Sequence, residues 1–326
     1  MAGAEIIISN LLSPVVLAFA LGMAAALVRS DLEFPEAMYH ALTIFLLFAI
    51  GLKGGIALAA TTLAEIALPL AATLMLGVVT PLTAFGVLRW IGRIDRVNAA
   101  AIAAHYGSVS AVTFLAAQAF GQTMGLPGEG YMPALVAVLE VPAIVVALLL
   151  VGRSVQDDAE RHGGGRGAAM REVLTGRSVV LLVGGLVVGF VADPAGLATV
   201  EPFFIGLFPG ALTLFLLELG MVAARRLRDL RRVGPFLLAF GVVVPVLHGC
   251  LGVWVGQYAG LSIGGSAVLG AMVGSASYIA APAAVRIALP QANPAFYLTA
   301  ALGITFPFNL TLGIPLYYAF ARWMGA

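Results

Sequence analysis

Cysteine, charge and strand-like alternation are all scarce in this sequence. A single cysteine, Cys250, excludes an intramolecular disulfide, and no group of histidine, cysteine and acidic residues has the spacing of a transition-metal site. Charged residues make up 10% of the 326 residues, and the net charge of +1 gives no basic surface for nucleic acid. Alternating polar and apolar segments typical of outer-membrane barrels are absent. No nucleophile and base form a recognisable pair, so we expect neither an enzyme nor a cofactor.

Apolar residues are abundant instead. They account for 61% of the chain and the mean hydropathy is +1.03, which indicates an all-α integral membrane protein. Arg29 and acidic residues follow the first apolar run, so no cleavable signal peptide is expected. Ten segments are long enough, or nearly so, to cross a hydrocarbon core of about 30 Å. They lie at about 11–28, 39–60, 66–88, 97–121, 133–152, 177–192, 203–223, 235–256, 262–288 and 294–320.

Arginine predicts the orientation of these segments. If the linker at 153–176, with Arg153, Arg161, Arg166 and Arg171, is cytoplasmic, the basic clusters at 89–96 and 225–232 are cytoplasmic too. Only Arg322 departs from this pattern. The connections predicted to lie outside contain no lysine or arginine; they are 61–65, 122–132, 193–202 and 257–261. We therefore expect ten spans with both termini outside.

The two halves of the chain resemble each other. ALTIFLLFAIGLKGG at 41–55 aligns with ALTLFLLELGMVAAR at 211–225, and GSVSAVT at 107–113 aligns with GSASYIA at 274–280. Each half has five predicted spans, an odd number, so the second half must enter the membrane from the opposite side. The predicted parts are a first repeat at 1–152, a cytoplasmic linker at 153–176 and an inverted second repeat at 177–326.

The fourth and ninth spans contain residues that disfavour a continuous helix. These residues are Gly107, Ser108 and Ser110 in the first half and Gly274, Ser275 and Ser277 in the second. Backbone groups freed within a membrane need protein or a lined cavity to satisfy them. Two half-helix N-termini related by the repeat would point at one place near the midplane and form a site for a small oxyanion. The alternative is that these small residues only allow helices to pack closely.

Acidic and basic residues inside apolar segments form a second group of candidates. Glu140 precedes Pro142, where freed carbonyls and a carboxylate supply hard oxygen ligands for sodium, together with Thr113, Thr305 and Asn309. Glu218 either has a functional role or pairs with Arg225 near a helix end. Lys53 either acts within the membrane or extends to its outer surface. His105 and His248 are expected to be packed and hydrogen-bonded rather than to carry protons.

Several motifs resemble one transporter family along essentially the whole chain. AIGLKGG (49–55), GSVSAVT (107–113), LELGMVAARR (217–226) and the block SASYIAAPAAVRIALPQANPAFYLTAALGITFPFNLTLGIPLYY (275–318) are similar to sodium-dependent bicarbonate transporters of the SbtA type. The resemblance implies core and gate domains, a homotrimer, and a PII-like cytosolic regulator. It also implies that the paired serines contribute to both the bicarbonate and the sodium regions. The sodium ligands expected on this basis are Ser110, Thr113, Glu140, Ser277, Thr305 and Asn309.

These observations lead to a functional expectation. The chain is predicted to be a multi-pass protein of the bacterial plasma membrane that carries bicarbonate into the cell with sodium, one group of helices moving against another. The alternatives are a sodium-coupled carrier of another small anion, a sodium/proton antiporter and, less favoured, a membrane sensor.

Overall fold

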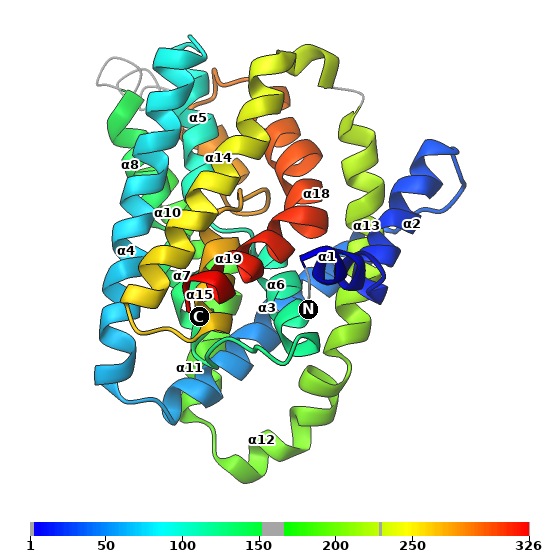
Figure 1. Ribbon diagram of the computed structural model, residues 1–326, viewed down its shortest axis with the longest axis vertical. Coiled ribbons are helices and arrows are strands. Elements are labelled where there is room, and N and C mark those ends of the chain that lie inside the picture. Colours follow the sequence, from blue (N-terminus) through cyan, green and yellow to red (C-terminus); the bar gives the residue numbers. More distant parts are fainter. Residues whose placement is uncertain (1–2, 152–165, 228–229, 326) are drawn as a thin grey trace.

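The computed structural model describes residues 3–151, 166–227 and 230–325, and all its regular elements are helices (Figure 1). The α-helices begin with α1 (Gly3–Leu11), α2 (Pro14–Leu27), α3 (Glu36–Ala59), α4 (Leu63–Gly86), α5 (Arg96–Gly107), α6 (Ala111–Thr123), α7 (Met132–Leu139) and α8 (Pro142–Val151). They continue with α10 (Arg166–Thr175), α11 (Arg177–Val191), α12 (Pro194–Glu201), α13 (Phe208–Leu227), α14 (Leu230–Tyr258), α15 (Ile263–Val273), α16 (Ala281–Ala288), α17 (Pro294–Leu298), α18 (Phe306–Phe308) and α19 (Ile314–Met324). Four π-helical segments complete the chain: η1 (Val87–Ile91), η2 (Pro202–Gly206), η3 (Thr299–Thr305) and η4 (Asn309–Gly313).

Seven helices in the described part of the chain are long and apolar enough to cross a membrane. They correspond to seven of the ten predicted segments. The other three are shorter or bent: α2 and α15 are short apolar helices, and α11 joins the preceding helix at an angle of 49°. The prediction of an all-helical membrane protein is confirmed, whereas the count of ten spans stays a prediction.

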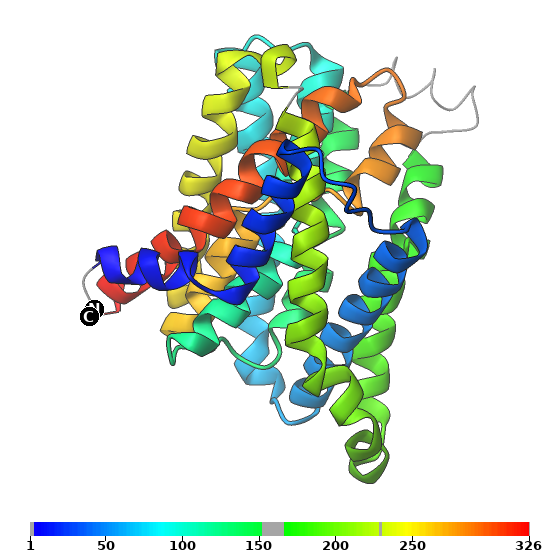
Figure 2. The same ribbon diagram turned by 90° about the vertical axis from the view of Figure 1, so that its right-hand side faces the viewer.

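Two helix pairs form one side of the molecule. α2 packs along α13, and α11 packs along α3 (Figure 2). Small residues allow the close approach, because a Cβ atom on Gly220 would overlap the carbonyl oxygen of Phe19 and one on Gly185 would overlap that of Phe48. In each pair, the first helix of one half of the chain therefore packs against the second helix of the other half.

A second group of helices encloses the breaks. α4, α5 and α8 pack against one another, and α14, α15 and α19 form the corresponding set. α6 packs against α15 of the second set, and α5 packs against α16, which follows α15 in the chain. Alanine, leucine and valine make up much of the core, and Tyr106, Tyr317 and Phe114 are among the largest fully buried residues. This group therefore brings residues of both halves to the centre of the molecule.

The N-terminal helix α1 was not among the predicted elements. It packs against α19 and η4, and the Nδ2 of Asn10 donates hydrogen bonds to the carbonyls of Leu310 (2.8 Å) and Thr311 (3.1 Å). Both carbonyls belong to η4, so the side-chain amide of Asn10 contacts two residues of that segment. α1 is thereby attached to the last long helical stretch rather than to its sequence neighbour α2 alone.

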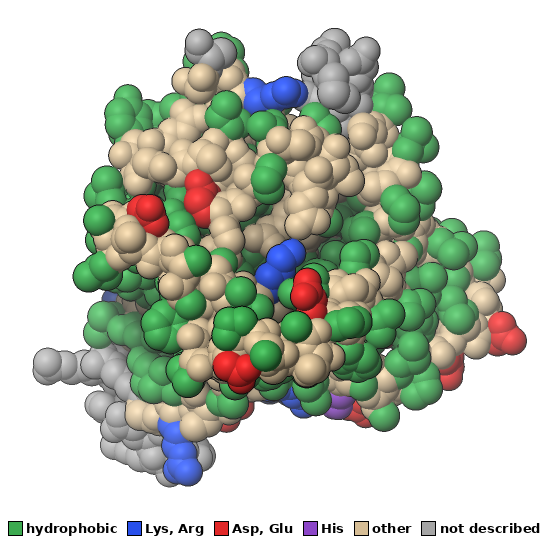
Figure 3. Space-filling model, turned by 90° about the horizontal axis from the view of Figure 1, so that it is seen from below, with side chains coloured by type: hydrophobic (Ala, Val, Ile, Leu, Met, Phe, Trp, Pro, Cys, Tyr) green, Lys and Arg blue, Asp and Glu red, His purple; other side chains and the backbone are tan. Residues whose placement is uncertain are grey.

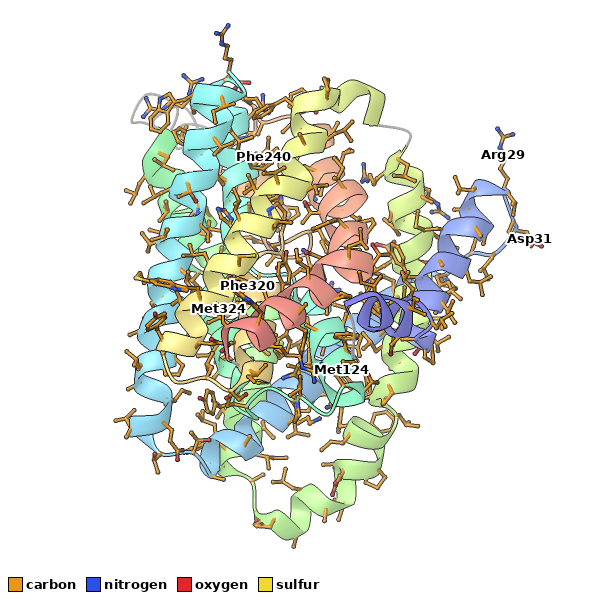
Figure 4. The ribbon with its side chains drawn as sticks, viewed as in Figure 1. Arg29, Asp31, Met124, Phe240, Phe320 and Met324 are labelled. Carbon is orange, nitrogen blue, oxygen red and sulfur yellow. The ribbon has the colours of Figure 1, made fainter. Side chains whose placement is uncertain are left out.

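Connections with and without basic residues lie towards opposite ends of the molecule. The turn between α3 and α4 and the helix α12 lie at the lower end in Figure 1, whereas the connection before α5 lies at the upper end. The face seen from below is covered mostly by hydrophobic and uncharged atoms (Figure 3). Arg29 and Asp31 extend away from the bundle at the connection between α2 and α3 (Figure 4). This distribution is the one that the positive-inside pattern requires.

The predicted linker is partly helical. Its first part, 153–165 with Arg153 and Arg161, lies outside the described residues, as do residues 228–229 of the basic cluster after α13. From Arg166 onward it forms α10, where Ala169 and Val173 are buried, and α10 packs against α16. The second part of the linker is therefore built into the helical bundle next to the second break.

Candidate functional site

The first break separates α5 from α6. α5 ends at Gly107, Ser108 is extended with φ −95° and ψ 156°, and α6 begins at Ala111 with Ser110 as its N-cap. The hydroxyl of Ser110 accepts a hydrogen bond from the amide of Thr113 at 3.2 Å. A Cβ atom on Gly107 would lie 2.6 Å from the ring of Pro81, so only glycine fits where α5 ends. Glycine and serine thus produce the interruption that the sequence predicted.

The second break separates α15 from α16. α15 ends at Val273 with Gly274 as its C-cap, and α16 begins only at Ala281. The hydroxyl of Ser277 accepts a hydrogen bond from the amide of Ala281 at 3.3 Å. The carbonyl of Gly274 accepts one from Nδ2 of Asn309 at 2.7 Å. This break is longer than the first, and side chains from neighbouring segments satisfy its backbone.

The two breaks are in direct contact. The amide of Ser110 donates to the hydroxyl of Ser275 at 2.8 Å, and the amide of Ser277 donates to the carbonyl of His105 at 2.8 Å. All four residues are buried. Segments 165 residues apart therefore exchange hydrogen bonds at the centre of the molecule, as expected if both breaks contribute to one site.

A small cavity lies beside this contact. Its volume is about 10 Å³, which is about the space that one water molecule needs. The N-terminal ends of α6 and α16 border it, together with α3, α11 and the α7–α8 junction. Its lining residues are Leu47, Val109, Ser110, Ala111, Glu140, Ser178, Ser277, Tyr278, Ile279 and Ala280.

Glu140 supplies the only charged side chain that lines this cavity. It lies where α7 ends, two residues before α8 begins at Pro142, and it is 2% exposed. Its Oε2 accepts a hydrogen bond from the hydroxyl of Ser178 at 3.2 Å. The predicted sodium ligands Ser110, Glu140 and Ser277 therefore line one cavity, joined by Ser178 from α11.

Two hydroxyl groups of the first break form no hydrogen bond in the described structure. Within the described part of the chain, the buried Oγ of Ser108 and Oγ1 of Thr113 have no hydrogen-bond partner. Ser275, the repeat counterpart of Ser108, uses its hydroxyl twice, accepting from Ser110 and donating to the carbonyl of Met272. Buried polar atoms are rarely left unsatisfied, so the serine and threonine hydroxyls of the first break are free to bind a ligand; in the second break the hydroxyl of Tyr278 is the buried oxygen without a partner in the described structure.

Thr305 and Asn309 are placed differently from the other predicted sodium ligands. The hydroxyl of Thr305 donates to the carbonyl of Gly241 and pairs with the hydroxyl of Tyr106, both at 2.7 Å. The amide oxygen of Asn309 accepts from Tyr317 at 2.9 Å. Neither residue lines the cavity that holds Glu140, and Ser108 and Thr113 of the first break also lie outside its lining. Both side chains support the breaks through hydrogen bonds.

The other polar residues singled out in the sequence lie outside the cavity. His105 stacks on Tyr297 with ring centroids 4.4 Å apart, and its Nδ1 lies 2.7 Å from the carbonyl of Ala101. His248 lies 2.8 Å from the hydroxyl of Thr83. Both histidines are packed and hydrogen-bonded, as expected. Glu218 is buried in α13 and forms no salt bridge with Arg225 in the described structure.

Ser178 and Tyr278 were missed from sequence. Ser178 follows Arg177 at the start of a short apolar segment, where nothing marks it as a site residue. Tyr278 lies inside the GSASYIA motif, but its aromatic ring gave no sign of a place in a polar cavity. The packing of α11 against α3 and α7 brings Ser178 to Glu140.

A comparison with family models identifies the chain. Residues 14–322 match the Na⁺-dependent bicarbonate transporter superfamily. The chain belongs to this superfamily. No curated protein matches it. The match covers both breaks, Glu140 and Ser178, so the resemblance noted from the motifs is confirmed over nearly the full chain.

Proposed function

We propose that this member of the superfamily is a secondary active transporter that carries bicarbonate into the cell together with sodium, across the bacterial plasma membrane. One observation carries the proposal: the N-terminal ends of α6 and α16 border one cavity that also contains a carboxylate and no basic side chain. Helix N-termini attract anions, and buried oxygen ligands attract sodium. A site of this composition suits a small oxyanion accompanied by a hard cation.

The anion would bind at the backbone amides. Each helix N-terminus carries roughly half a positive charge and amides without helical partners. The hydroxyls of Ser108, Ser110 and Ser277 are short donors next to these amides, with Gly107, Gly274 and Ser275 shaping the two breaks around them. The present cavity holds about one water, so binding of a planar anion requires its walls to separate.

Sodium would bind on the side of Glu140. The carboxylate is buried, and a bicarbonate ion beside it would meet an unfavourable like charge. A sodium ion held by Glu140 with the hydroxyls of Ser110, Ser277 and Thr113 removes this repulsion. Binding of either ion then raises the affinity for the other by the same factor. Glu140 therefore makes anion binding depend on sodium.

Transport would require one group of helices to move against the other. The contact pattern supports a pseudo-two-fold arrangement, since α2–α13 and α11–α3 are equivalent pairs and α4–α5–α8 matches α14–α15–α19. We propose that the second group, which contains both breaks, is the moving core of an elevator-type carrier and that the two pairs form the gate. Ten spans in two inverted repeats and a homotrimer complete this proposal.

The deciding experiment is uptake of labelled bicarbonate into proteoliposomes under an inward sodium gradient, with potassium as the substitute. Sodium-dependent accumulation that falls in Ser110→Ala and Ser277→Ala is the expected result. Uptake of a short carboxylate in place of bicarbonate would identify another cargo. Sodium/proton exchange without an anion, lost only in Glu140→Gln, would indicate an antiporter, and saturable binding without flux would indicate a sensor.

The same vesicles give the stoichiometry. With one sodium per bicarbonate the net charge moved is zero, and a tenfold sodium gradient, worth about 1.4 kcal/mol, supports about tenfold accumulation. A second sodium adds about 2.3 kcal/mol per 100 mV of membrane potential. Clamping the potential with valinomycin separates these two cases.

A further inference from the structure

A second and much larger cavity lies beside the C-terminal half of α6. Its volume is about 570 Å³, within the range of sites for drug-sized ligands. Its walls come from α2, α3, η2 and α13 on one side and from α6 and η4 on the other. Most of the lining is apolar, including Ile50, Phe120, Phe204, Phe208 and Leu212.

Lys53 lines this cavity from the C-terminal half of α3 and is the only lysine in the chain. Its side chain is exposed and has no hydrogen-bond or ion-pair partner among the described residues. Gln118 and Gln122 of α6 line the same cavity, and their side-chain amides are also without a partner in the described structure. One cation and two amide donors thus face a mainly apolar space.

These features restrict the chemistry of an occupant. A small oxyanion would satisfy Lys53 but leave most of the apolar wall uncovered. A neutral lipid chain would cover the wall but leave the ammonium group of Lys53 without a counter-ion. A ligand with one anionic head and an apolar tail satisfies both parts of the cavity.

We propose that this cavity binds a single-chain amphipathic carboxylate, such as a fatty acid. The carboxylate accepts hydrogen bonds from Lys53 and from the amides of Gln118 and Gln122. The tail lies along Phe204, Phe120 and their apolar neighbours. Nothing in this binding site overlaps the small cavity at Glu140, because the two share no lining residue.

Occupancy would also affect transport. The walls belong to both helix groups, so a bound tail would keep the groups from sliding past each other. This consequence rests on the proposed function, whereas the binding itself does not.

Binding is tested on the purified full-length protein without any transport. The acetyl ester of N-hydroxysulfosuccinimide acylates amines, and Lys53 is the only side-chain amine. Peptide mass spectrometry measures its acetylation rate separately from that of the α-amine. At saturating concentration, laurate should slow the acetylation of Lys53 at least tenfold, whereas dodecanol should leave the rate unchanged. Lys53→Gln should weaken displacement of the fluorescent probe 11-(dansylamino)undecanoate by laurate about tenfold, whereas Lys53→Arg should retain it.

A second variant tests the tail. Ala119→Phe fills part of the cavity without changing the charge of its lining. It should weaken laurate binding while leaving the acetylation rate of the free protein unchanged. Equal laurate binding by wild type and Lys53→Gln, or equally tight dodecanol binding, would overturn the proposal. Protection of Lys53 by bicarbonate but not by laurate would also overturn it and assign the cavity to the small anion. Monodisperse elution of each variant establishes that it is folded.

Discussion

The amide of Ser110 donates a hydrogen bond of 2.8 Å to the hydroxyl of Ser275, across the two halves of the chain. Both residues are at most 3% exposed, so water cannot replace either partner. This bond fixes the start of α6 against the end of α15. Its strength therefore decides how firmly the two breaks are held together.

Ser275→Ala should destabilise the protein. The substitution leaves the buried amide of Ser110 without an acceptor, at a cost of about 1–3 kcal/mol. A lower thermal unfolding temperature in detergent is the expected result. Ser266→Ala is the matched control, because this buried serine only donates a long bond of 3.3 Å to Leu261. Equal unfolding temperatures for the two variants would contradict the role given to Ser275.

Ser108→Ala should impair transport without destabilising the protein, in contrast to Ser275→Ala. The hydroxyl of Ser108 has no partner in the described structure, so its removal breaks no hydrogen bond within the protein. We expect an unchanged unfolding temperature and a several-fold higher KM for bicarbonate or sodium in the vesicle assay. A loss of stability with an unchanged KM would show that Ser108 is structural.

Glu140→Gln should separate sodium binding from folding. Glutamine retains the shape and can still bond to Ser178, but it removes the buried charge that we propose holds sodium. The sodium concentration for half-maximal uptake should rise at least tenfold. Glu36→Gln, whose side chain is 86% exposed, serves as the control and should leave uptake as in wild type. Unaltered sodium dependence in Glu140→Gln would remove this residue from the site.

Gly220→Ala should disrupt the contact between α13 and α2. The added methyl group would overlap the carbonyl oxygen of Phe19, so the helices must separate at a cost of about 1–3 kcal/mol. Gly210→Ala lies in the same helix with nothing within 4 Å of its Cβ, and it should be neutral or slightly stabilising. Unfolding temperatures of the two variants, measured side by side, check this difference.

Asp95 should make a pH-dependent contribution at the N-terminus of α5. Partial burial raises the pKa of this carboxyl group, but hydrogen bonds from Asn98 and Val97 outweigh burial and lower the pKa below its ordinary value of 3.8. A carboxyl group with a lowered pKa stabilises the folded state at pH values above its ordinary pKa. This stabilisation is lost as the pH falls through the pKa of the group in the folded state. Asp95→Ala should cost about 0.5–2 kcal/mol near neutral pH. The difference in unfolding temperature from wild type should shrink as the pH is lowered from 5 to 3; a constant difference would contradict the capping role.

The sequence predicted the features that local chemistry determines. Glycine and serine at 107–110 and 274–277 disfavour a helix wherever they occur, and both segments are interrupted. Apolar runs marked the spans for a similar reason, since the membrane core requires them. The internal repeat then indicated that the two interruptions belong together, and the bonds of Ser110 and Ser277 join them.

Features that depend on packing between distant segments were not predictable in this way. Ser178 reaches Glu140 because α11 packs along α3 and against α7. Thr305 and Asn309 have suitable oxygen atoms for sodium, but neighbouring tyrosines and carbonyls already engage them. Helix α1 escaped prediction because its few apolar residues gain their partners from α19 and η4, far along the chain.

The attachment of α1 sets a limit on movement. Asn10 holds α1 to Leu310 and Thr311, while α2 lies along α13, and only Leu12 and Ser13 connect the two helices. Three successive Cα–Cα steps of about 3.8 Å span at most about 11 Å. A movement that would separate the end of α1 from the start of α2 by more than this distance must first break the two hydrogen bonds of Asn10. The two-residue connection therefore limits how far α1 and α2 can separate while α1 stays on η4.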